Sequence, residues 1–581
     1  MNPTQSPTLP YRRHALVLAL TLALASPTLS AATFNVSGTC TLDSAISNAN
    51  TDTDTDGANV GCPAGNGADV INLAKKATYA LANKLLPTIS SVITINGNHA
   101  TIDSKALYAR AFYITNTGNL TLNKLTVKNG YEQKGGGILN RGQLQLNDST
   151  ITGNGVYAAC DYYCFGSYGG GIFNSGTATL TNSKISNNTA DAGYSINGDS
   201  GRGGGIYNSG VMTLTNSTVS NNKTLGSHYR GEGPMGGGII NFGTMTLNGS
   251  TVANNSADSE GGGIRNRGTM TLTDSTVSHN NAPSGGGIYS GHFIFSSNTL
   301  TLTNSTVVNN QATGGGGIFN AQVLNLSNST VSANKASNSG GGIANKGVLN
   351  LTHSTLSANQ AAKGNGGGIF NLHNMTLTNT LIANSQSGGD CVNKSGGITT
   401  LQGVNLVEDG SCGADIMGDP KLVTLLDNGG ITATQALLAD SPALDTANKP
   451  LCTNQDQRGI SRPQPSGGGC DIGAFERMTS IPNTVASVVQ FFDNGILTGT
   501  LVGTGNTKQS PLFSSALRNQ LLAAGRYKNQ NQTASACSQL SRTLKRIDTD
   551  NTPSSGEYVT GSDATALAAK LAGLFGPWSC Q

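Results

Sequence analysis

The sequence predicts an all-β fold, a right-handed parallel β-helix, followed by a small C-terminal α-helical bundle. Two observations predict the β-helix. A motif of three glycines and an isoleucine recurs through the middle of the chain, and a short stretch of alternating apolar and polar residues follows most copies. A third observation predicts the bundle: after residue 484, apolar residues recur at three- and four-residue steps.

The composition excludes several classes of protein. The chain has 581 residues, of which 78 are glycine, and only 11% are charged. Aliphatic residues recur at fixed places, which argues against disorder. The formal net charge is +3, and no basic stripe of the kind that binds nucleic acid is present in the sequence. We therefore expect no nucleic-acid partner.

Residues 1–32 have the pattern of a secretory signal peptide. Arg12, Arg13 and His14 precede an apolar run at 15–25, and small residues follow at Ser30 and Ala32. The run is too short to span a bilayer comfortably as a helix, and no other stretch of the sequence is suited to do so. We expect an exported protein, secreted or on the outer surface, with no transmembrane segment in the mature chain.

Residues 111–400 contain the repeat. Each triple-glycine motif ends in an isoleucine, and neighbouring copies are 24 to 34 residues apart, as in a solenoid whose extra residues form loops. Stacking of the coils would bury these isoleucines in one column. A β-propeller is the alternative, but its blades need about forty residues each. The predicted core isoleucines are Ile138, Ile172, Ile206, Ile239, Ile264, Ile288, Ile318, Ile343 and Ile369.

Polar residues at equivalent corners predict a second stacked column. Asn174, Asn208, Asn241 and Asn266 each lie two residues after a repeat isoleucine. In stacked coils their amides are placed to exchange hydrogen bonds.

Ten cysteines fall into sequence-local pairs, which suits disulfides in an oxidising compartment. Metal binding is the alternative, but histidines and cysteines do not cluster with zinc spacing. The pairing inferred from proximity is Cys40 with Cys62, Cys160 with Cys164, Cys391 with Cys412, Cys452 with Cys470, and Cys537 with Cys580.

The C-terminal part changes character. Residues 478–484 are a predicted linker, and 485–581 form the predicted helical domain. Its helices are expected over 485–492, 512–524, 534–547 and 564–575, with Cys537 and Cys580 holding the bundle together.

An acid-rich patch near the N-terminus resembles the start of a calcium loop. Asp52, Asp54 and Asp56 alternate and are followed by Gly57. The twelfth loop position, where a glutamate normally completes the site, is Pro63. Calcium at these three aspartates is therefore a hypothesis that competes with a solvated surface loop, and we expect no other cofactor.

Catalytic candidates are few. Glycoside hydrolases need two placed carboxylates, yet the coils carry almost no acids, and Asp274 stands where sister coils have asparagine. A group in the last coils, Asp456, Arg458, Asp471 and Glu476, is interpreted as an ion-paired seal of the core rather than an active site. The isolated histidines are expected to face solvent: His292, His353 and His373.

Aromatic residues gather on one insertion between coils, around Cys160 and Cys164. Such a loop can bind sugar rings or a protein partner, or it can fold back on its own disulfide, and the sequence leaves both open. The residues are Tyr157, Tyr162, Tyr163, Phe165 and Tyr168.

Several motifs resemble families of exported bacterial proteins. Cys40–Asn50 and Cys62–Ile71 resemble the CSLREA-type N-terminal motif, although Thr41 replaces its usual serine and Asp43 and Ser44 replace its Arg-Glu pair. Four later segments are similar to the choice-of-anchor Q domain: Leu425–Gly430, Leu438–Asp445, Asp456–Gly459 and Cys470–Glu476. The C-terminal helices resemble a FIMAH-type module.

These resemblances imply a β-helix on an exported or surface-attached bacterial protein, and they name no reaction. They divide the rest of the chain into an N-terminal cap with the first coils over 33–110 and terminal coils over 401–477. We expect a non-catalytic protein that acts by binding, as in adhesion or matrix attachment, with a polysaccharide or another surface protein as partner. The alternative is a polysaccharide lyase or glycoside hydrolase on the same scaffold.

Overall fold

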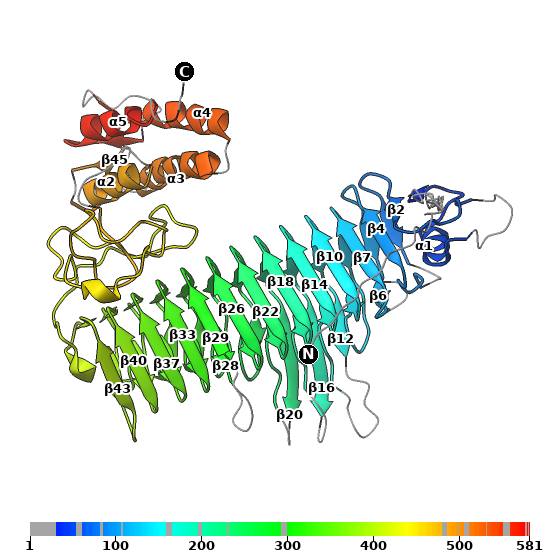
Figure 1. The fold of residues 1–581 in the computed structure, drawn as a ribbon, viewed down its shortest axis with the longest axis horizontal. Coiled ribbons are helices and arrows are strands. Elements are labelled where there is room, and N and C mark those ends of the chain that lie inside the picture. Colours follow the sequence, from blue (N-terminus) through cyan, green and yellow to red (C-terminus); the bar gives the residue numbers. More distant parts are fainter. Residues whose placement is uncertain are drawn as a thin grey trace, which may run out of the picture.

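Stacked coils of short parallel strands form the body of the protein in the computed structural model (Figure 1). The structure describes residues 31–53, 61–81, 85–105, 109–157, 166–195, 200–228, 232–291, 299–478, 485–498, 500–504, 510–529, 532–549, 558–575, 578 and 580. The predicted signal peptide thus lies almost wholly outside the described residues. A complete coil contributes one strand to each of three long sheets, called sheets A, B and C here.

Sheet A has 14 strands and lies toward the viewer in Figure 1. Its strands are β1 (Thr33–Asn35), β2 (Asp69–Asn72), β4 (Val92–Asn96), β7 (Asn119–Asn123), β10 (Gln143–Asn147), β14 (Thr177–Thr181), β18 (Val211–Thr215), β22 (Thr244–Asn248), β26 (Thr269–Thr273), β29 (Thr299–Thr303), β33 (Val323–Ser327), β37 (Val348–Thr352), β40 (Asn374–Thr378) and β43 (Ile398–Gln402).

Sheet B has 13 strands. They are β3 (Thr78–Ala80), β5 (Thr101–Asp103), β8 (Thr126–Lys128), β11 (Thr150–Thr152), β15 (Lys184–Ser186), β19 (Thr218–Ser220), β23 (Thr251–Ala253), β27 (Thr276–Ser278), β30 (Thr306–Val308), β34 (Thr330–Ser332), β38 (Thr355–Ser357), β41 (Leu381–Ala383) and β44 (Leu406–Val407).

Sheet C has 11 strands, most of which begin at a repeat isoleucine. They are β6 (Phe112–Ile114), β9 (Ile138–Asn140), β13 (Ile172–Asn174), β17 (Ile206–Asn208), β21 (Ile239–Asn241), β25 (Ile264–Asn266), β28 (Ile288–Ser290), β32 (Ile318–Asn320), β36 (Ile343–Asn345), β39 (Ile369–Asn371) and β42 (Cys391–Asn393).

Smaller sheets lie beside these three. Between sheets B and C, some coils add strands to a fourth sheet, called sheet D: β12 (Gly155–Tyr157), β16 (Thr189–Ser195), β20 (Lys223–His228) and β24 (Ser256–Ala257). Later coils add the pair β31 (Gln311–Gly314) and β35 (Lys335–Ser339).

The coils stack in register, so that equivalent side chains form columns. Ile206 pairs with Ile239 in sheet C, and Leu214 pairs with Leu247 in sheet A. All nine repeat isoleucines are completely buried in one continuous core. The fold class predicted from the repeat is therefore confirmed.

Glycine is required at the corner before each sheet C strand that begins at a repeat isoleucine. The first of the three glycines has a positive φ, as at Gly236 with 65°, which favours glycine over other residues. A Cβ on the second glycine would collide with backbone: at Gly262 it would lie 2.4 Å from the carbonyl oxygen of Asn281. The triple glycine thus turns the chain and allows adjacent segments to approach closely.

The predicted asparagine column is also present. Asn174 donates to the Oδ1 of Asn208 at 2.7 Å, and Asn208 donates to that of Asn241 at 2.8 Å. Asn241 in turn donates to Asn266 at 2.9 Å. These side chains are buried, and the ladder satisfies their amides inside the core.

Helix α1 (Leu42–Thr51) covers the N-terminal end of the stack. Thr41 caps it, and Leu42, Ala45 and Ile46 turn inward against the first coil. This buries apolar side chains that the first coil would otherwise expose. A disulfide between Cys40 and Cys62 holds the chain beside the helix.

The stacked strands end at Val407. The prediction that terminal coils extend over 401–477 is therefore wrong after that residue. Residues 408–477, called the terminal segment here, contain no strand in a stretch that the structure describes completely. They contain two short 3-10 helices, η1 (Ser411–Gly413) and η2 (Lys449–Leu451). Part of the segment folds back over the outer face of sheet B instead of extending the stack.

Polar contacts hold the terminal segment to sheet B. Thr306 donates to the carbonyl oxygen of Ala433 at 2.7 Å, and Thr330 donates to Gln457 at 2.6 Å. Thr355 accepts from the backbone of Ala474 at 2.9 Å. Three successive coils therefore share one covering segment that lies more than a hundred residues further along the chain.

Four helices follow: α2 (Val485–Thr498), α3 (Ser510–Asn529), α4 (Thr533–Leu544) and α5 (Ala564–Ala572). Between them, β45 (Val502–Gly503) pairs with β46 (Val559–Thr560). They enclose their own apolar core, as the sequence predicts. Arg518 of α3 donates to the backbone carbonyl of Asp427, which joins the bundle to the terminal segment.

Four of the five predicted disulfides are present: Cys40–Cys62, Cys391–Cys412, Cys452–Cys470 and Cys537–Cys580. Cys160 and Cys164 lie outside the described residues. None of the described helices is long and apolar enough to span a membrane.

Candidate binding face on sheet C

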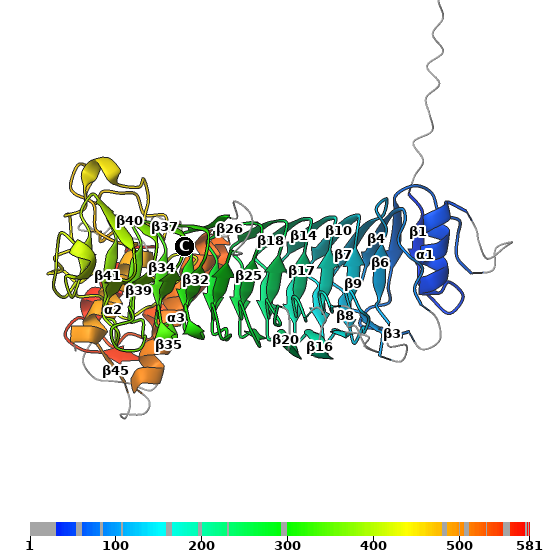
Figure 2. The ribbon, with the colours of Figure 1, turned by 90° about the horizontal axis from the view of Figure 1, so that it is seen from below.

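The outer surface of sheet C differs in chemistry from the other faces. Each of its strands has three residues, of which the first and third generally point into the core of the stack and the middle one points away from it. From β6 to β39 this middle residue is half-buried at Tyr113, Phe173, Tyr207 and Phe370 and buried in the other strands. In-register pairing aligns these middle residues along the stack, and Figure 2 looks onto this face. From β6 to β39 they are Tyr113, Leu139, Phe173, Tyr207, Ile240, Arg265, Tyr289, Phe319, Ala344 and Phe370.

Aromatic rings in this column stack from coil to coil. Phe173 and Tyr207 have ring centroids 4.8 Å apart and planes 4° apart. Tyr289 and Phe319 stack at 4.6 Å and 13°. The coil spacing of about 4.8 Å sets these distances, so the stacking that builds the central core also aligns aromatic rings on the other side of sheet C. Tyr289 and Phe319 are buried there in a separate small cluster.

Cationic side chains lie over the rings. The Arg141 guanidinium is 5.5 Å from the ring centroid of Tyr113. The Lys134 ammonium is 5.4 Å from that of Tyr168, and the Lys346 ammonium is 5.3 Å from that of Phe319. Such contacts place positive charge along the aromatic column. We call this column and its flanking charged residues the basic–aromatic face.

Each of three acidic residues on this face pairs with arginine. Glu232 accepts from Arg267 at 2.6 and 2.8 Å and from Arg202 at 3.3 Å. Glu260 accepts from Arg265 at 2.7 Å. Glu132 pairs with Arg110 at 3.4 Å. These acids therefore neutralise arginines at the centre and near one end of the face.

Arg265 is a buried cation at the centre of this face. It lies 4.2 Å from the ring centroid of Tyr289 and donates to the carbonyl oxygens of Asn266 and Gly291. Burial lowers the pKa of Arg265 to about 10, although Glu260 opposes the shift, and burial raises the pKa of Tyr289. Both groups keep their ordinary charge at neutral pH, so this cluster is a fixed structural anchor.

The basic residues outnumber the acidic ones on this face. Lys134, Arg141 and Lys346 are exposed and form no ion pair within the part of the chain that the structure describes. Their charge is therefore available to a ligand. The sequence interpretation missed this face. The residues that directly follow the repeat isoleucines would have indicated it, because several of them are aromatic or basic.

Several insertions border sheet C in the sequence. The residues outside the described ranges at 158–165, 196–199 and 229–231 precede sheet C strands, and 292–298 follow one. Tyr162, Tyr163, Phe165 and His292 belong to these insertions, whereas Tyr157 and Tyr168 are described. The longer spacings between repeat isoleucines thus come from insertions that are next to sheet C strands in the sequence.

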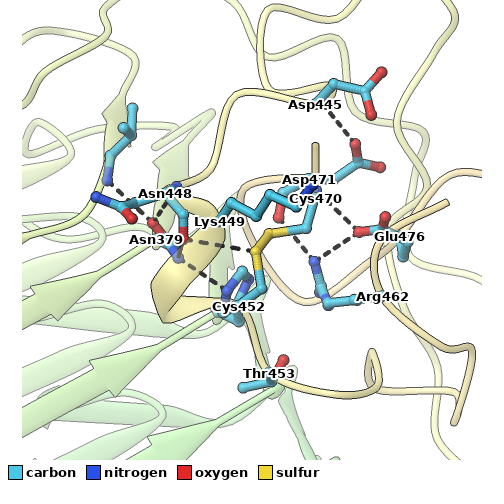
Figure 3. Close-up of a disulfide and its surroundings, with 12 residues drawn as sticks. Asn379, Asp445, Asn448, Lys449, Cys452, Thr453, Arg462, Cys470, Asp471 and Glu476 are labelled. Atoms are coloured by element: carbon cyan, nitrogen blue, oxygen red, sulfur yellow. Dashed lines mark hydrogen bonds and ion pairs between the residues drawn. A yellow bond between two sulfur atoms is a disulfide. The ribbon is translucent and has the colours of Figure 1, made fainter. Parts of the chain in front are cut away.

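The predicted ion-paired group lies elsewhere, within the terminal segment, and Figure 3 shows Asp471 and Glu476 of this group. Asp456 pairs with Arg458 at 2.7 Å, and Glu476 pairs with Arg462, which the sequence interpretation missed, at 2.9 Å. Asp471 accepts from the backbone of Asp445 at 2.9 Å. Burial raises the pKa of Asp471 to about 6 and that of Glu476 to about 7. The network braces the terminal segment above sheet B rather than closing the end of the core.

The expectation that the isolated histidines face solvent is wrong for His353. It is completely buried, because the terminal segment covers its corner between sheets A and B. Burial lowers its pKa to about 3, and the nearby charge of Arg462 acts in the same direction. His353 also lies near Cys452 and Cys470, but the disulfide between these cysteines leaves no thiolate to bind a metal. His373 is exposed, as expected.

The remaining sequence candidates do not assemble into a described site. Asp52 accepts a hydrogen bond from the backbone of Gly67 at 2.8 Å, while Asp54 and Asp56 lie outside the described residues. Calcium at these three positions stays a prediction. Asp274 occupies a corner with φ of 51°, where sister coils have asparagine with a similar φ, as at Asn304.

Comparison with known proteins does not identify a family for this chain. No protein-family model matches the chain, and the comparison with curated proteins finds no match. The chain is similar to a solved structure described as the crystal structure of pectate lyase Pel9A, with 14% identity and a TM-score of 0.30 over 78% of this chain and 98% of that one. Such a distant likeness supports no functional conclusion, and the strand pairing alone establishes the parallel β-helix.

Proposed function

We propose that this is an extracellular, non-catalytic protein that binds an acidic polysaccharide through the basic–aromatic face. The observation that carries the proposal is that Lys134, Arg141 and Lys346 are exposed over aromatic rings and have no acidic partner within the described ranges. Surface attachment, adhesion and a protein partner are further proposals on the same face. The four disulfides suit an oxidising compartment.

The chemistry of the face fits a chain of acidic sugars. Ammonium and guanidinium groups form charge-assisted hydrogen bonds with carboxylates or sulfates. Aromatic rings contact the C–H surfaces of sugars, which are apolar. A polymer also engages several weak contacts at once, which raises the overall affinity well above that of each contact.

The length of the face favours a polymer over a small molecule. Lys134 lies in the coil of β9 and Lys346 in that of β36, seven coil steps away along sheet C. At the usual strand spacing, this separation is about 34 Å. A single sugar cannot span that distance, whereas an oligosaccharide of several residues can.

The alternative, a lyase or hydrolase, requires carboxylates arranged for acid–base work or for calcium. Glu232 and Glu260, the carboxylates at the centre of the face, are each held by arginine. Nothing in their arrangement favours catalysis over binding.

Binding of polygalacturonate to the full chain tests the proposal, with uncharged dextran as the comparison polymer. We expect saturable binding of polygalacturonate that weakens as salt rises, because salt screens exposed charges. Equal binding of dextran and polygalacturonate, or none of either, would contradict it. Release of unsaturated or reducing ends during incubation would establish the enzymatic alternative instead.

A further inference from the structure

A groove on a different side of the molecule carries an inference that does not depend on the basic–aromatic face. It lies where sheet B passes into sheet D in the N-terminal coils and has a volume of about 500 Å³. Its lining includes Lys105, Asn129, Tyr131 and Asn187, which come from successive coils. This volume is within the usual range for small-molecule sites.

An aromatic ring forms one wall of the groove. Tyr131 is 38% exposed, and its ring stacks on that of Tyr157 at 4.8 Å and 12°. Gly155 leaves room for the ring, since a Cβ there would lie 2.9 Å from the Cδ2 of Tyr131. The stacked partner and the missing side chain together fix an exposed ring beside the cavity.

Polar groups suited to hydroxyls surround this ring. The side-chain amide of Asn129 donates to Asp103 at 2.9 Å, and that of Asn187 donates to Thr152 at 3.4 Å. Their side-chain carbonyl oxygens accept no hydrogen bond among the residues that the structure describes. Lys105 is exposed and forms no ion pair within the same ranges.

We propose that this groove binds one pyranose ring of a neutral sugar. The C–H surface of the sugar packs on Tyr131, while its hydroxyls donate to the Oδ1 atoms of Asn129 and Asn187 and accept from Lys105. The proposal goes beyond the basic–aromatic face in both location and ligand, because recognition here uses stacking and neutral hydrogen bonds. It adds a second sugar-binding site to the protein.

Saturation-transfer NMR with methyl glycosides of glucose, galactose, mannose and N-acetylglucosamine tests this site on the full chain. We expect a saturable signal from at least one glycoside. Tyr131→Ala weakens binding by at least about tenfold, while Tyr131→Phe keeps it within about threefold because the stacking ring remains. Asn187→Gly, which suits the positive φ of that corner, weakens binding at an unchanged melting temperature.

The matched control is Tyr527→Ala on α3, which removes a ring with a similar exposed fraction, 37%, outside both proposed sites and leaves glycoside binding unchanged. Absence of a saturable signal from all four glycosides would overturn the proposal, as would a folded Tyr131→Ala variant that binds like the wild type. Polygalacturonate binding, measured in the same variants, is expected to survive Tyr131→Ala. The two proposals can therefore fail separately.

Discussion

Asn208 donates its side-chain amide to the Oδ1 of Asn241 in the next coil at 2.8 Å, and both side chains are completely buried. The bond couples adjacent coils inside the core, where water cannot replace it. The asparagine column is therefore part of what fixes the register of sheet C, since a shifted coil would leave buried amides without partners.

Asn241→Ala is expected to lower the free energy of unfolding by about 2 kcal/mol, because partners on both sides lose a buried hydrogen bond. Thr244→Ala, on the exposed surface of sheet A in the same coil, is the control and is expected to cost about 0.5 kcal/mol or less. Urea unfolding followed by circular dichroism measures both. Equal midpoints for the two variants would contradict a stabilising role for the ladder.

Gly262→Ala is expected to destabilise the stack by about 3 kcal/mol or to prevent folding, because the new Cβ meets the backbone of Asn281 at 2.4 Å. Gly38→Ala is the matched change, since a Cβ there meets nothing within 4 Å. Soluble yield and thermal melting of the two variants provide the measurement. A Gly262→Ala protein as stable as Gly38→Ala would show that the coils can separate without cost.

His353 makes stability depend on pH. Because its pKa in the folded protein is about 3 and the ordinary value is 6.5, the unfolded chain binds a proton below pH 6.5 that the folded chain does not. Stability therefore falls as pH drops through this window, by about 1.4 kcal/mol per pH unit at most.

His353→Asn isolates this effect, because asparagine occupies the same corner in neighbouring coils at Asn328 and Asn379 with positive φ. Urea midpoints of both proteins between pH 7 and pH 4 are the measurement. The wild type is expected to lose stability relative to the variant on acidification. Asp471 and Glu476 titrate in both proteins, so parallel pH profiles would mean that His353 is protonated or exposed in the folded state.

The repeat made the body of the fold predictable from the sequence. A glycine corner, an isoleucine and an inward asparagine recur together, and stacking is the arrangement that buries every copy at once. Helix α1 was predictable as well, because Leu42, Ala45, Ile46 and Ala49 lie on one helical face.

The covering of sheet B was not predictable in this way. Thr330 has the same alternating pattern as threonines in open coils, yet it contacts Gln457, which is 127 residues away. Local periodicity carries no information on such a contact. For the same reason His353 was expected in solvent and Arg462 was missed.

The candidate face was present in the sequence but not in the residues that define the repeat. Phe173, Tyr207, Arg265 and Tyr289 vary among copies, because an outward position is free to vary where the core is not. Only the register of the coils shows that these variable residues form one continuous column, in which Arg265 and Tyr289 are buried.

Two sets of charge-removing substitutions distinguish recognition by this surface from an effect of net charge alone. One variant carries Lys134→Gln, Arg141→Gln and Lys346→Gln on the basic–aromatic face. The other carries Lys184→Gln, Lys223→Gln and Lys335→Gln, which are exposed lysines of sheets B and D and of β35. Each variant loses three positive charges.

The affinity of these two variants for polygalacturonate at low salt is the most direct measurement of the central claim. We predict a loss of at least about tenfold for the first variant, since each exposed charge contact contributes about 0.5–1 kcal/mol, and a change within about twofold for the second. An equal loss in both, or none in the first, would contradict recognition by the basic–aromatic face.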